Sequence, residues 1–420
     1  MIHSEAEVAK PRNLGPPFAL RSRWIVLAFA FSATVINYLD RQSLSVLAPV
    51  LLQQFHISAT GYGNVITAFM LAYTLMNGVS GPLLDRWGLK IGYAASIALW
   101  STAELLQIFT RGARSLGIFR FLLGAGEAGN YPAGVKLIRV WFPPPERSMA
   151  SGIFNGGASV GSILAPPLLA FSALLLGWRA CFVLVGSLGF IWLAAWLLFY
   201  GPPSRSADAH RLSRIPVREL IWHRFVWQFT LSKVFSDPVW YFYTFWFPQY
   251  LKAARAFTLQ QIGQKATIPF ITGGIGNLAG GFLCQRLHAL GCSAQRARRL
   301  SVLIFSAMMA AAIWAPRVES AASSIALISV ATFGYCGALA NLLAIPGDLF
   351  PENAVASIWG LASMGSGVGG MLFSQMTGFL VSYYSFRPVF LVFGITPLFA
   401  ATLVWFLPHN DHSLTPPIPS

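Results

Sequence analysis

Residues 24–50 read WIVLAFAFSATVINYLDRQSLSVLAPV, an apolar run that contains one acidic and one basic side chain, Asp40 and Arg41. A helix of about 20 apolar residues crosses the hydrocarbon core of a bilayer. The preceding segment, 1–23, is polar and basic, and no small-residue cleavage signal follows it. We therefore expect an uncleaved first membrane span that carries a charge pair.

Apolar runs of similar length recur along the chain, separated by short polar breaks. They predict an all-α integral membrane protein with twelve transmembrane helices. The spans after the first are 62–84, 91–110, 116–138, 148–172, 179–200, 226–250, 264–286, 300–316, 323–347, 354–381 and 386–407.

The composition agrees with a membrane protein, because 55% of the residues are hydrophobic and only 10% are charged. Soluble domains carry roughly 25% charged residues. The net charge of +15 would suggest nucleic-acid binding in a soluble protein. Here Lys and Arg concentrate in the short polar breaks, as expected where loops flank membrane spans. We expect membrane lipid, and no nucleic acid, to be the partner of this charge.

The longest polar break, 201–225, is rich in proline and arginine and predicts a linker between two halves. Lys and Arg are more frequent on the side of the N-terminal tail, which places both termini in the cytoplasm. The expected organisation is a tail at 1–23, an N-terminal six-helix bundle at 24–200, the linker at 201–225, a C-terminal six-helix bundle at 226–407 and a tail at 408–420.

The two halves repeat each other in sequence. The matching positions are Trp178 with Phe386, Arg179 with Arg387, Phe182 with Phe390 and Gly186 with Gly394. A parallel repeat of two six-helix halves predicts two pseudo-symmetric bundles with a site between them.

The segment Gly81-Pro-Leu-Leu-Asp-Arg-Trp-Gly-Leu-Lys90 falls between the second and third spans. It resembles the signature loop of the major facilitator superfamily. We expect Gly81 to allow close helix approach and Asp85 to meet a helix N-terminus or a basic partner. Such a contact would hold one state of a transport cycle and break in the other. The expected gating residues are Gly81, Asp85, Arg86, Gly88 and Lys90.

Four further segments resemble the anion:cation symporter family, most closely its bacterial hexuronate branch. They are Asn37–Arg41, Arg120–Pro132, Asp237–Leu251 and Asn341–Pro351. The resemblance implies the major facilitator fold and a secondary transporter of a small organic anion. It also implies the bacterial inner membrane.

Charged residues inside membrane spans are costly unless they are paired or hydrated, so they are functional candidates. They are Asp40, Arg41, Glu104, Arg120, Glu127, Lys136, Lys233 and Asp237. Arg120 and Glu127 are seven residues apart and share one helical face, which Asn130 and Tyr131 continue.

The resemblance to the galactonate symporter implies that Asp40 and Glu127 bind protons and that Arg120 is their charge partner. Arg41 is the expected donor to a substrate carboxylate. Lys233 and Asp237, four residues apart, can neutralise each other. Pro238 is expected to unwind the seventh span beside Trp240 and Tyr241. The expected substrate site is Tyr38, Arg41, Tyr73, Asn77, Asn130, Trp240 and Tyr241.

The resemblance implies symport of a sugar-acid anion, such as galacturonate or glucuronate, with protons, and we expect a monomer that uses no cofactor. Sodium coupling stays open, as do aldonate, aldarate, aromatic and dicarboxylic acid substrates. An intramembrane enzyme would need histidines or a metal set within the spans, yet every histidine falls in a tail, a loop or a span end. No phosphate-binding Gly-x-x-x-x-Gly-Lys loop is present. A channel would lack the two-half repeat around one charged cluster.

Overall fold

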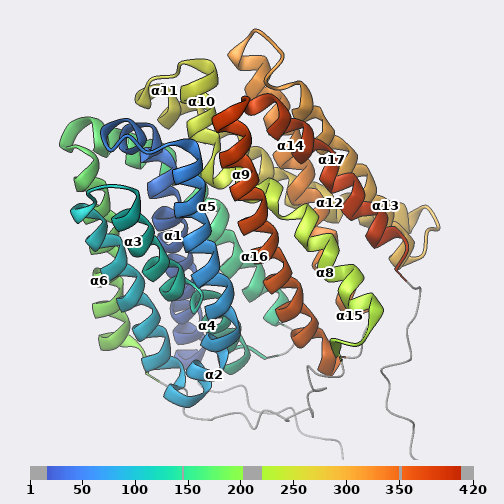
Figure 1. Cartoon of the computed structure of the whole chain (residues 1–420). Coiled ribbons are helices and arrows are strands. Elements are labelled where there is room, and N and C mark those ends of the chain that lie inside the picture. The colour runs from blue at the N-terminus through green and yellow to red at the C-terminus, as the bar shows by residue number, and fades with distance from the viewer. Residues whose placement is uncertain (1–16, 144–145, 202–219, 350–351, 408–420) are drawn as a thin grey trace, which may run out of the picture.

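The computed structural model describes residues 17–143, 146–201, 220–349 and 352–407, and every regular element in these ranges is a helix (Figure 1). Most of the predicted tails and linker lie outside the described residues. The predicted spans all coincide with helices or with runs of short helices.

The first half contains α1 to α6. Their bounds are α1 Pro17–Gln54, α2 Ala59–Leu106, η1 Gln107–Phe109, α3 Ala113–Glu127, α4 Asn130–Trp141, α5 Arg147–Leu176 and α6 Trp178–Phe199.

The second half contains the remaining helices. Their bounds are α8 Arg224–Ser236, α9 Pro238–Phe245, α10 Phe247–Arg255, α11 Leu259–Lys265, α12 Ile268–Ala289, α13 Ala294–Met309, η3 Ala310–Trp314, α14 Ala321–Leu342, α15 Ile345–Leu349, α16 Glu352–Tyr383 and α17 Phe386–Trp405.

Among the described residues, six segments are by themselves long and apolar enough to cross a membrane, which makes this a multi-pass membrane protein. They are Met149–Leu176, Trp178–Phe199, Leu259–Ala289, Ala294–Trp314, Ala321–Leu342 and Phe386–Trp405. Other predicted spans are interrupted. The fourth is divided into α3 and α4, and the seventh into α8, α9 and α10. Both interruptions fall in segments that carry candidate site residues.

Two local expectations were wrong in detail. The expected loop at 81–90 is helical, because α2 runs through the second and third spans with one non-helical residue, Gly88 (φ 76°, ψ 161°). Glycine adopts positive φ without a steric penalty, so a single residue turns the chain. The expected unwinding beside Pro238 is also minimal, because Pro238 starts α9 at a position that needs no hydrogen-bonded N–H. Trp240 and Tyr241 are therefore helical.

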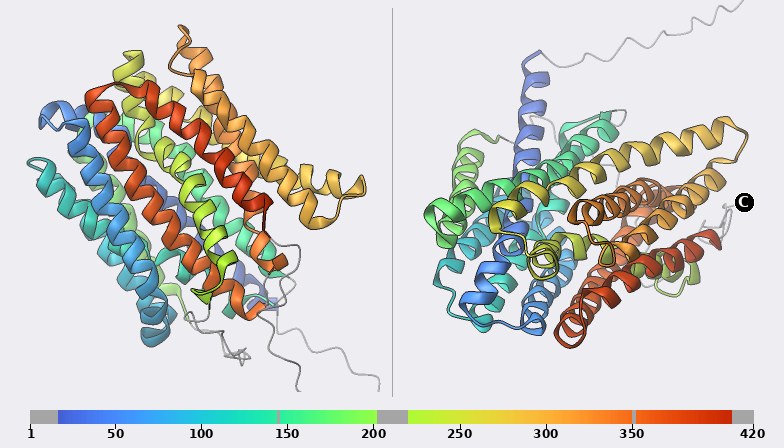
Figure 2. Two further views of the ribbon diagram at one scale, coloured as in Figure 1. Left: turned by 45° about the vertical axis from the view of Figure 1, so that its right-hand side comes forward. Right: turned by 90° about the horizontal axis from the view of Figure 1, so that it is seen from above.

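The helices form two groups that lie side by side, α1 to α6 and α8 to α17 (Figures 1 and 2). Contacts between the groups join α2 with α16, α1 with α10 and α5 with α11. The end of the molecule that carries α11 is called the α11 end, and it is the top of Figure 1.

The hydrogen bonds that join the two groups gather toward the α11 end. The hydroxyls of Thr60 and Ser382 are 2.9 Å apart, and the Gln375 amide donates to Asn64 Oδ1 at 2.8 Å. The Tyr62 hydroxyl donates to the Phe245 carbonyl at 2.6 Å. The two halves are thus fastened together at this end.

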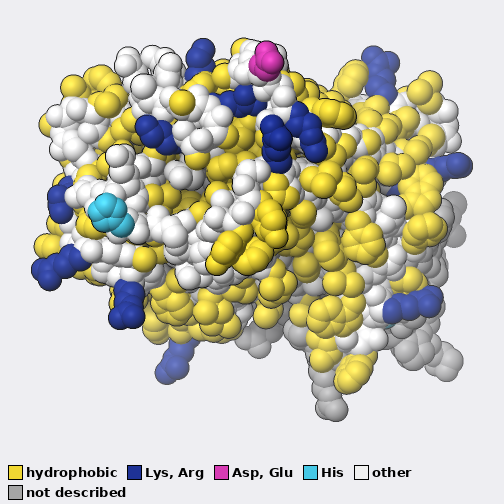
Figure 3. Space-filling model, turned by 45° about the horizontal axis from the view of Figure 1, so that its top comes forward, with side chains coloured by type: hydrophobic (Ala, Val, Ile, Leu, Met, Phe, Trp, Pro, Cys, Tyr) yellow, Lys and Arg dark blue, Asp and Glu magenta, His cyan; other side chains and the backbone are white. Residues whose placement is uncertain are grey.

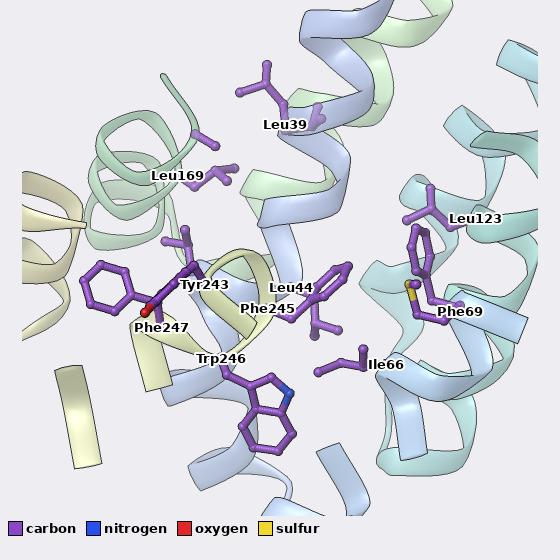
Figure 4. Close-up of a cluster of buried hydrophobic side chains, with 14 of the residues drawn as sticks. Leu39, Leu44, Ile66, Phe69, Leu123, Leu169, Tyr243, Phe245, Trp246 and Phe247 are labelled. Atoms are coloured by element: carbon purple, nitrogen blue, oxygen red, sulfur yellow. The ribbon is translucent and has the colours of Figure 1, made fainter. Parts of the chain in front are cut away.

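Apolar packing reinforces this closure. Figure 4 shows Phe245, Trp246 and Phe247 among side chains of the first half, including Leu44 and Ile66. The Trp246 ring meets Tyr62 edge-on, with ring centroids 4.9 Å apart. Aromatic pairs in this geometry stabilise packing beyond the area that they bury.

Candidate functional site

A cavity of about 90 Å³ lies in the first half, where α1 to α5 meet. The lining is Thr34, Asn37, Tyr38, Arg41, Tyr73, Glu127, Asn130, Tyr131, Phe154, Asn155 and Ala158. One cation, one carboxylate and several amides and hydroxyls therefore converge on one space inside a membrane bundle.

An ion pair between α1 and α3 forms the charged part of this cavity. Arg41 Nε donates to Glu127 Oε2 at 2.7 Å, and the side chains are 10% and 0% exposed. Within the described part of the chain, the Arg41 guanidinium makes no other hydrogen bond, so both terminal amino groups are available to a ligand. Planar carboxylates accept two parallel hydrogen bonds from such a group.

Aromatic rings hold the Arg41 guanidinium in place. Its carbon lies 4.6 Å from the Tyr73 ring centroid, 5.1 Å from that of Tyr38 and 5.7 Å from that of Phe69. Cation–π contacts of this kind favour a guanidinium over a compact ammonium group.

Asn130 ties three helices together at the edge of the cavity. Its Oδ1 accepts from the Tyr93 hydroxyl at 2.6 Å, and its Nδ2 donates to Thr34 Oγ1 at 3.2 Å. Asn130 follows the short break between α3 and α4, at Ala128 and Gly129. The break therefore places Glu127 and Asn130 together beside the cavity.

The direct partner of Glu127 is Arg41, whereas the expected partner, Arg120, interacts with Glu127 electrostatically without a direct ion pair. Arg120 instead donates to the Asp40 carbonyl at 3.0 Å and to Ser43 Oγ at 2.8 Å. Adjacent residues on a helix point about 100° apart. Arg41 therefore faces the cavity while Asp40 is fully buried behind it.

Three residues of the expected substrate site do not line this cavity. Asn77 donates to the Tyr73 carbonyl at 2.9 Å. Trp240 stacks on Tyr335 with ring centroids 5.4 Å apart, and the Tyr241 hydroxyl lies 3.0 Å from Ser366 Oγ. Tyr241 is nonetheless close enough to interact electrostatically with Tyr73 and Arg41 across the two halves.

Lys233 and Asp237 form an ion pair of 2.9 Å in the second half, as their spacing indicated. The Tyr335 hydroxyl donates to Asp237 Oδ1 at 3.2 Å, and the Lys233 ammonium lies 5.6 Å from the Trp359 ring centroid. Both side chains are less than 10% exposed. The pair therefore links α8 to Tyr335 of α14 and Trp359 of α16.

The expected gating residues lie at the end opposite α11. Asp85 pairs with Lys136 of α4 at 2.8 Å, and Lys136 also donates to the Leu84 carbonyl at 2.8 Å. The basic partner therefore belongs to the same half. Close helix approach at Gly81 was wrong for this structure, because a Cβ there would meet nothing within 4 Å. Arg86 is exposed, and the Lys90 carbonyl accepts from Trp196 Nε1 at 3.1 Å.

Polar residues that carry no charge were missed by the sequence analysis. Asn37 and Asn155 line the cavity, and Ser43 and Gln107 contact the buried charges behind it. Their only signal in the sequence is that they are polar within apolar spans.

The surface at the α11 end is basic (Figure 3). Exposed basic residues at helix ends here are Arg111, Arg179, Lys252, Lys265 and Arg387. A field of one sign raises the local concentration of oppositely charged solutes, so this end attracts anions.

Known proteins share both the sequence and the fold of this chain. The Major Facilitator Superfamily model matches residues 30–374 and 229–420. The hexuronate transporter of Escherichia coli K12 is 29% identical over 411 residues, covering 93% of this chain and 95% of that protein. The galacturonate transporter of Dickeya chrysanthemi is 31% identical over 279 residues, covering 62% of this chain and 81% of that protein.

Among solved structures, a bacterial homologue of the human lysosomal transporter Spinster, in an inward-facing and occupied conformation, superposes with a TM-score of 0.73. It is 19% identical, and the match covers 92% of this chain and 96% of that one. Because the family model matches nearly the whole chain, this protein belongs to the major facilitator superfamily.

Proposed function

We propose that this protein is a secondary active transporter that carries a hexuronate, such as galacturonate or glucuronate, into a bacterial cell together with protons. The observation that supports this most directly is Arg41, which lines the cavity and whose Nε donates to Glu127 while its terminal amino groups make no hydrogen bond within the described part of the chain. The relatives transport hexuronates and galacturonate. A sugar acid can place its carboxylate against the Arg41 guanidinium and its hydroxyls against Asn37, Asn130 and Asn155.

The site carries out binding and release, and we assign it no chemical reaction. A carrier needs two arrangements, each open to one side. The inter-half hydrogen bonds at the α11 end support an arrangement closed there. With both termini in the cytoplasm, the α11 end faces outward, so we assign this structure to the inward-facing state of a protein in the inner membrane.

Reconstituted protein is expected to take up galacturonate saturably and to concentrate it when the outside is acidic. For electroneutral symport of one proton, each pH unit supports about tenfold accumulation. Radiolabelled uptake into proteoliposomes, with and without a protonophore, measures this. Accumulation on a sodium gradient alone would show that sodium, and not the proton, is the coupling ion. A non-saturating current would indicate a channel. Aldonates, aldarates, aromatic acids and dicarboxylates are the competing substrates in the same assay.

Asp85→Asn is expected to reduce turnover several-fold while leaving ligand affinity unchanged. We propose that Asp85 is held by Lys136 when this end is open and changes partner when it closes. Asp85 is 65% exposed, so the free energy of unfolding should change by less than about 1 kcal/mol. Exchange rates in proteoliposomes and ligand-induced thermal shifts separate the two effects. Lost binding with normal turnover would contradict the gating role.

A further inference from the structure

A second polar cluster lies behind the cavity, between α1, α2 and α3. It consists of Asp40, Ser43, Glu104, Gln107 and Arg120, and each residue is at most 1% exposed. Buried charges are retained where they are compensated or where they have a function. The cluster contains two carboxyl groups and one guanidinium.

The two carboxyl groups, of Asp40 and Glu104, differ in the hydrogen bonds that they accept. Ser43 Oγ donates to Glu104 Oε1 at 2.6 Å, and Gln107 donates to Glu104 Oε2. Neither carboxyl oxygen of Asp40 has a hydrogen-bond partner among the residues that the structure describes, although both are buried. An ionised carboxylate is stabilised by hydrogen bonds to its oxygens. A buried carboxyl group without such bonds has a lower free energy as the neutral acid.

Arg120 is shared between these groups. Its two terminal nitrogens donate to the Asp40 carbonyl and to Ser43 Oγ, and through Ser43 it reaches Glu104. The other arginine of the site, Arg41, is occupied by Glu127 at 2.7 Å. The Arg120 guanidinium also lies close enough to both buried carboxyl groups, of Asp40 and Glu104, to interact with them electrostatically. The charges of these three groups balance when one of the two carboxyl groups carries a proton.

Other titratable groups around Glu104 do not change this balance. Glu127 on α3 is neutralised by Arg41, and Cys181 faces Glu104 from α6. Tyr62, beside Arg120, donates its hydroxyl proton to the Phe245 carbonyl. A thiol and a phenol are both neutral at ordinary pH.

We propose that Asp40 and Glu104 form one proton-binding site around Arg120, separate from the Arg41–Glu127 pair, in which ionised Glu104 keeps the proton on Asp40. Glu104 is a positioning residue, because it acts on Asp40 through Ser43 and Arg120. This inference rests on the proposed proton coupling and names a further residue that sets its pH dependence.

Glu104→Gln is expected to move the external pH of half-maximal galacturonate uptake to lower values by about one unit. Without the Glu104 charge, Arg120 favours ionised Asp40, so a more acidic medium is needed to protonate it. Glu104→Asp should largely restore the wild-type value, and Ser43→Ala should give a smaller shift in the same direction. Glu319→Gln, the same substitution at an exposed site near the α11 end, is the matched control.

Infrared titration of purified protein in detergent tests the site independently of transport. We expect a protonated-carboxyl band that disappears in Asp40→Asn and titrates at lower pH in Glu104→Gln. If uptake by the wild-type protein does not depend on the pH gradient while this band is present, the proposed proton-coupled function is rejected and the shared site is retained. A band that is unchanged in Glu104→Gln, or a lower uptake rate with the wild-type pH midpoint, would overturn the shared site.

Discussion

Replacing Arg41 with lysine is expected to lower kcat/KM for galacturonate uptake at least about thirtyfold, while the protein still inserts and folds. A hydrogen bond to a charged group contributes about 1.5–3 kcal/mol, and about 2 kcal/mol corresponds to thirtyfold. Arg41 lines the cavity, and its guanidinium donates to Glu127 through Nε at 2.7 Å, which leaves the two terminal amino groups for a ligand. A lysine ammonium cannot occupy both places, because it is a single compact group.

The aromatic contacts strengthen this expectation. Tyr73 and Tyr38 lie 4.6 and 5.1 Å from the Arg41 guanidinium carbon and fix its plane. Initial rates of uptake, together with ligand-induced thermal shifts, measure the loss. Arg111→Lys, at an exposed arginine near the α11 end, is the matched control and should retain wild-type kinetics. Unchanged affinity of the Arg41→Lys variant for its best ligand would remove Arg41 from the substrate site.

Glu127→Gln should abolish concentrative uptake while preserving exchange. Entry of an anion into a negative-inside cell is opposed by ~2.3 kcal/mol per charge per 100 mV, so a cation must accompany it. In the proposed cycle Glu127 receives a proton from outside, releases Arg41 to the substrate carboxylate, and pairs with Arg41 again after the proton leaves inward. The Arg41–Glu127 pair observed at 2.7 Å corresponds to the state of that cycle in which Glu127 is ionised. Glutamine mimics the protonated acid permanently.

The measurement pairs two assays on the same proteoliposomes. Counterflow of labelled substrate should persist in Glu127→Gln, while the accumulation ratio on a pH gradient falls to about one. Glu146→Gln is a suitable control, because Glu146 pairs with Arg23 at the opposite end of the molecule, at 3.2 Å. A Glu127→Gln variant that still concentrates substrate with wild-type pH dependence would show that coupling runs through another group.

The all-α membrane fold could be predicted from the sequence, because apolar length is set by bilayer thickness and is visible one segment at a time. The scarcity of intramembrane charge also picked out Asp40, Arg41 and Glu127 without any structure. Helical spacing correctly paired Lys233 with Asp237, since Asp237 caps the C-terminus of the helix that carries Lys233.

Partners on different helices were decided by the tertiary structure. Periodicity shows which residues share a face of one helix, but the rotation and depth of each helix depend on packing against its neighbours. Glu127 therefore meets Arg41 rather than Arg120. For the same reason Glu104, 61 positions from Ser43 in sequence, accepts its hydroxyl and joins the Arg120 cluster. Closure of the α11 end likewise depends on contacts as distant as Thr60 with Ser382, which no local pattern encodes.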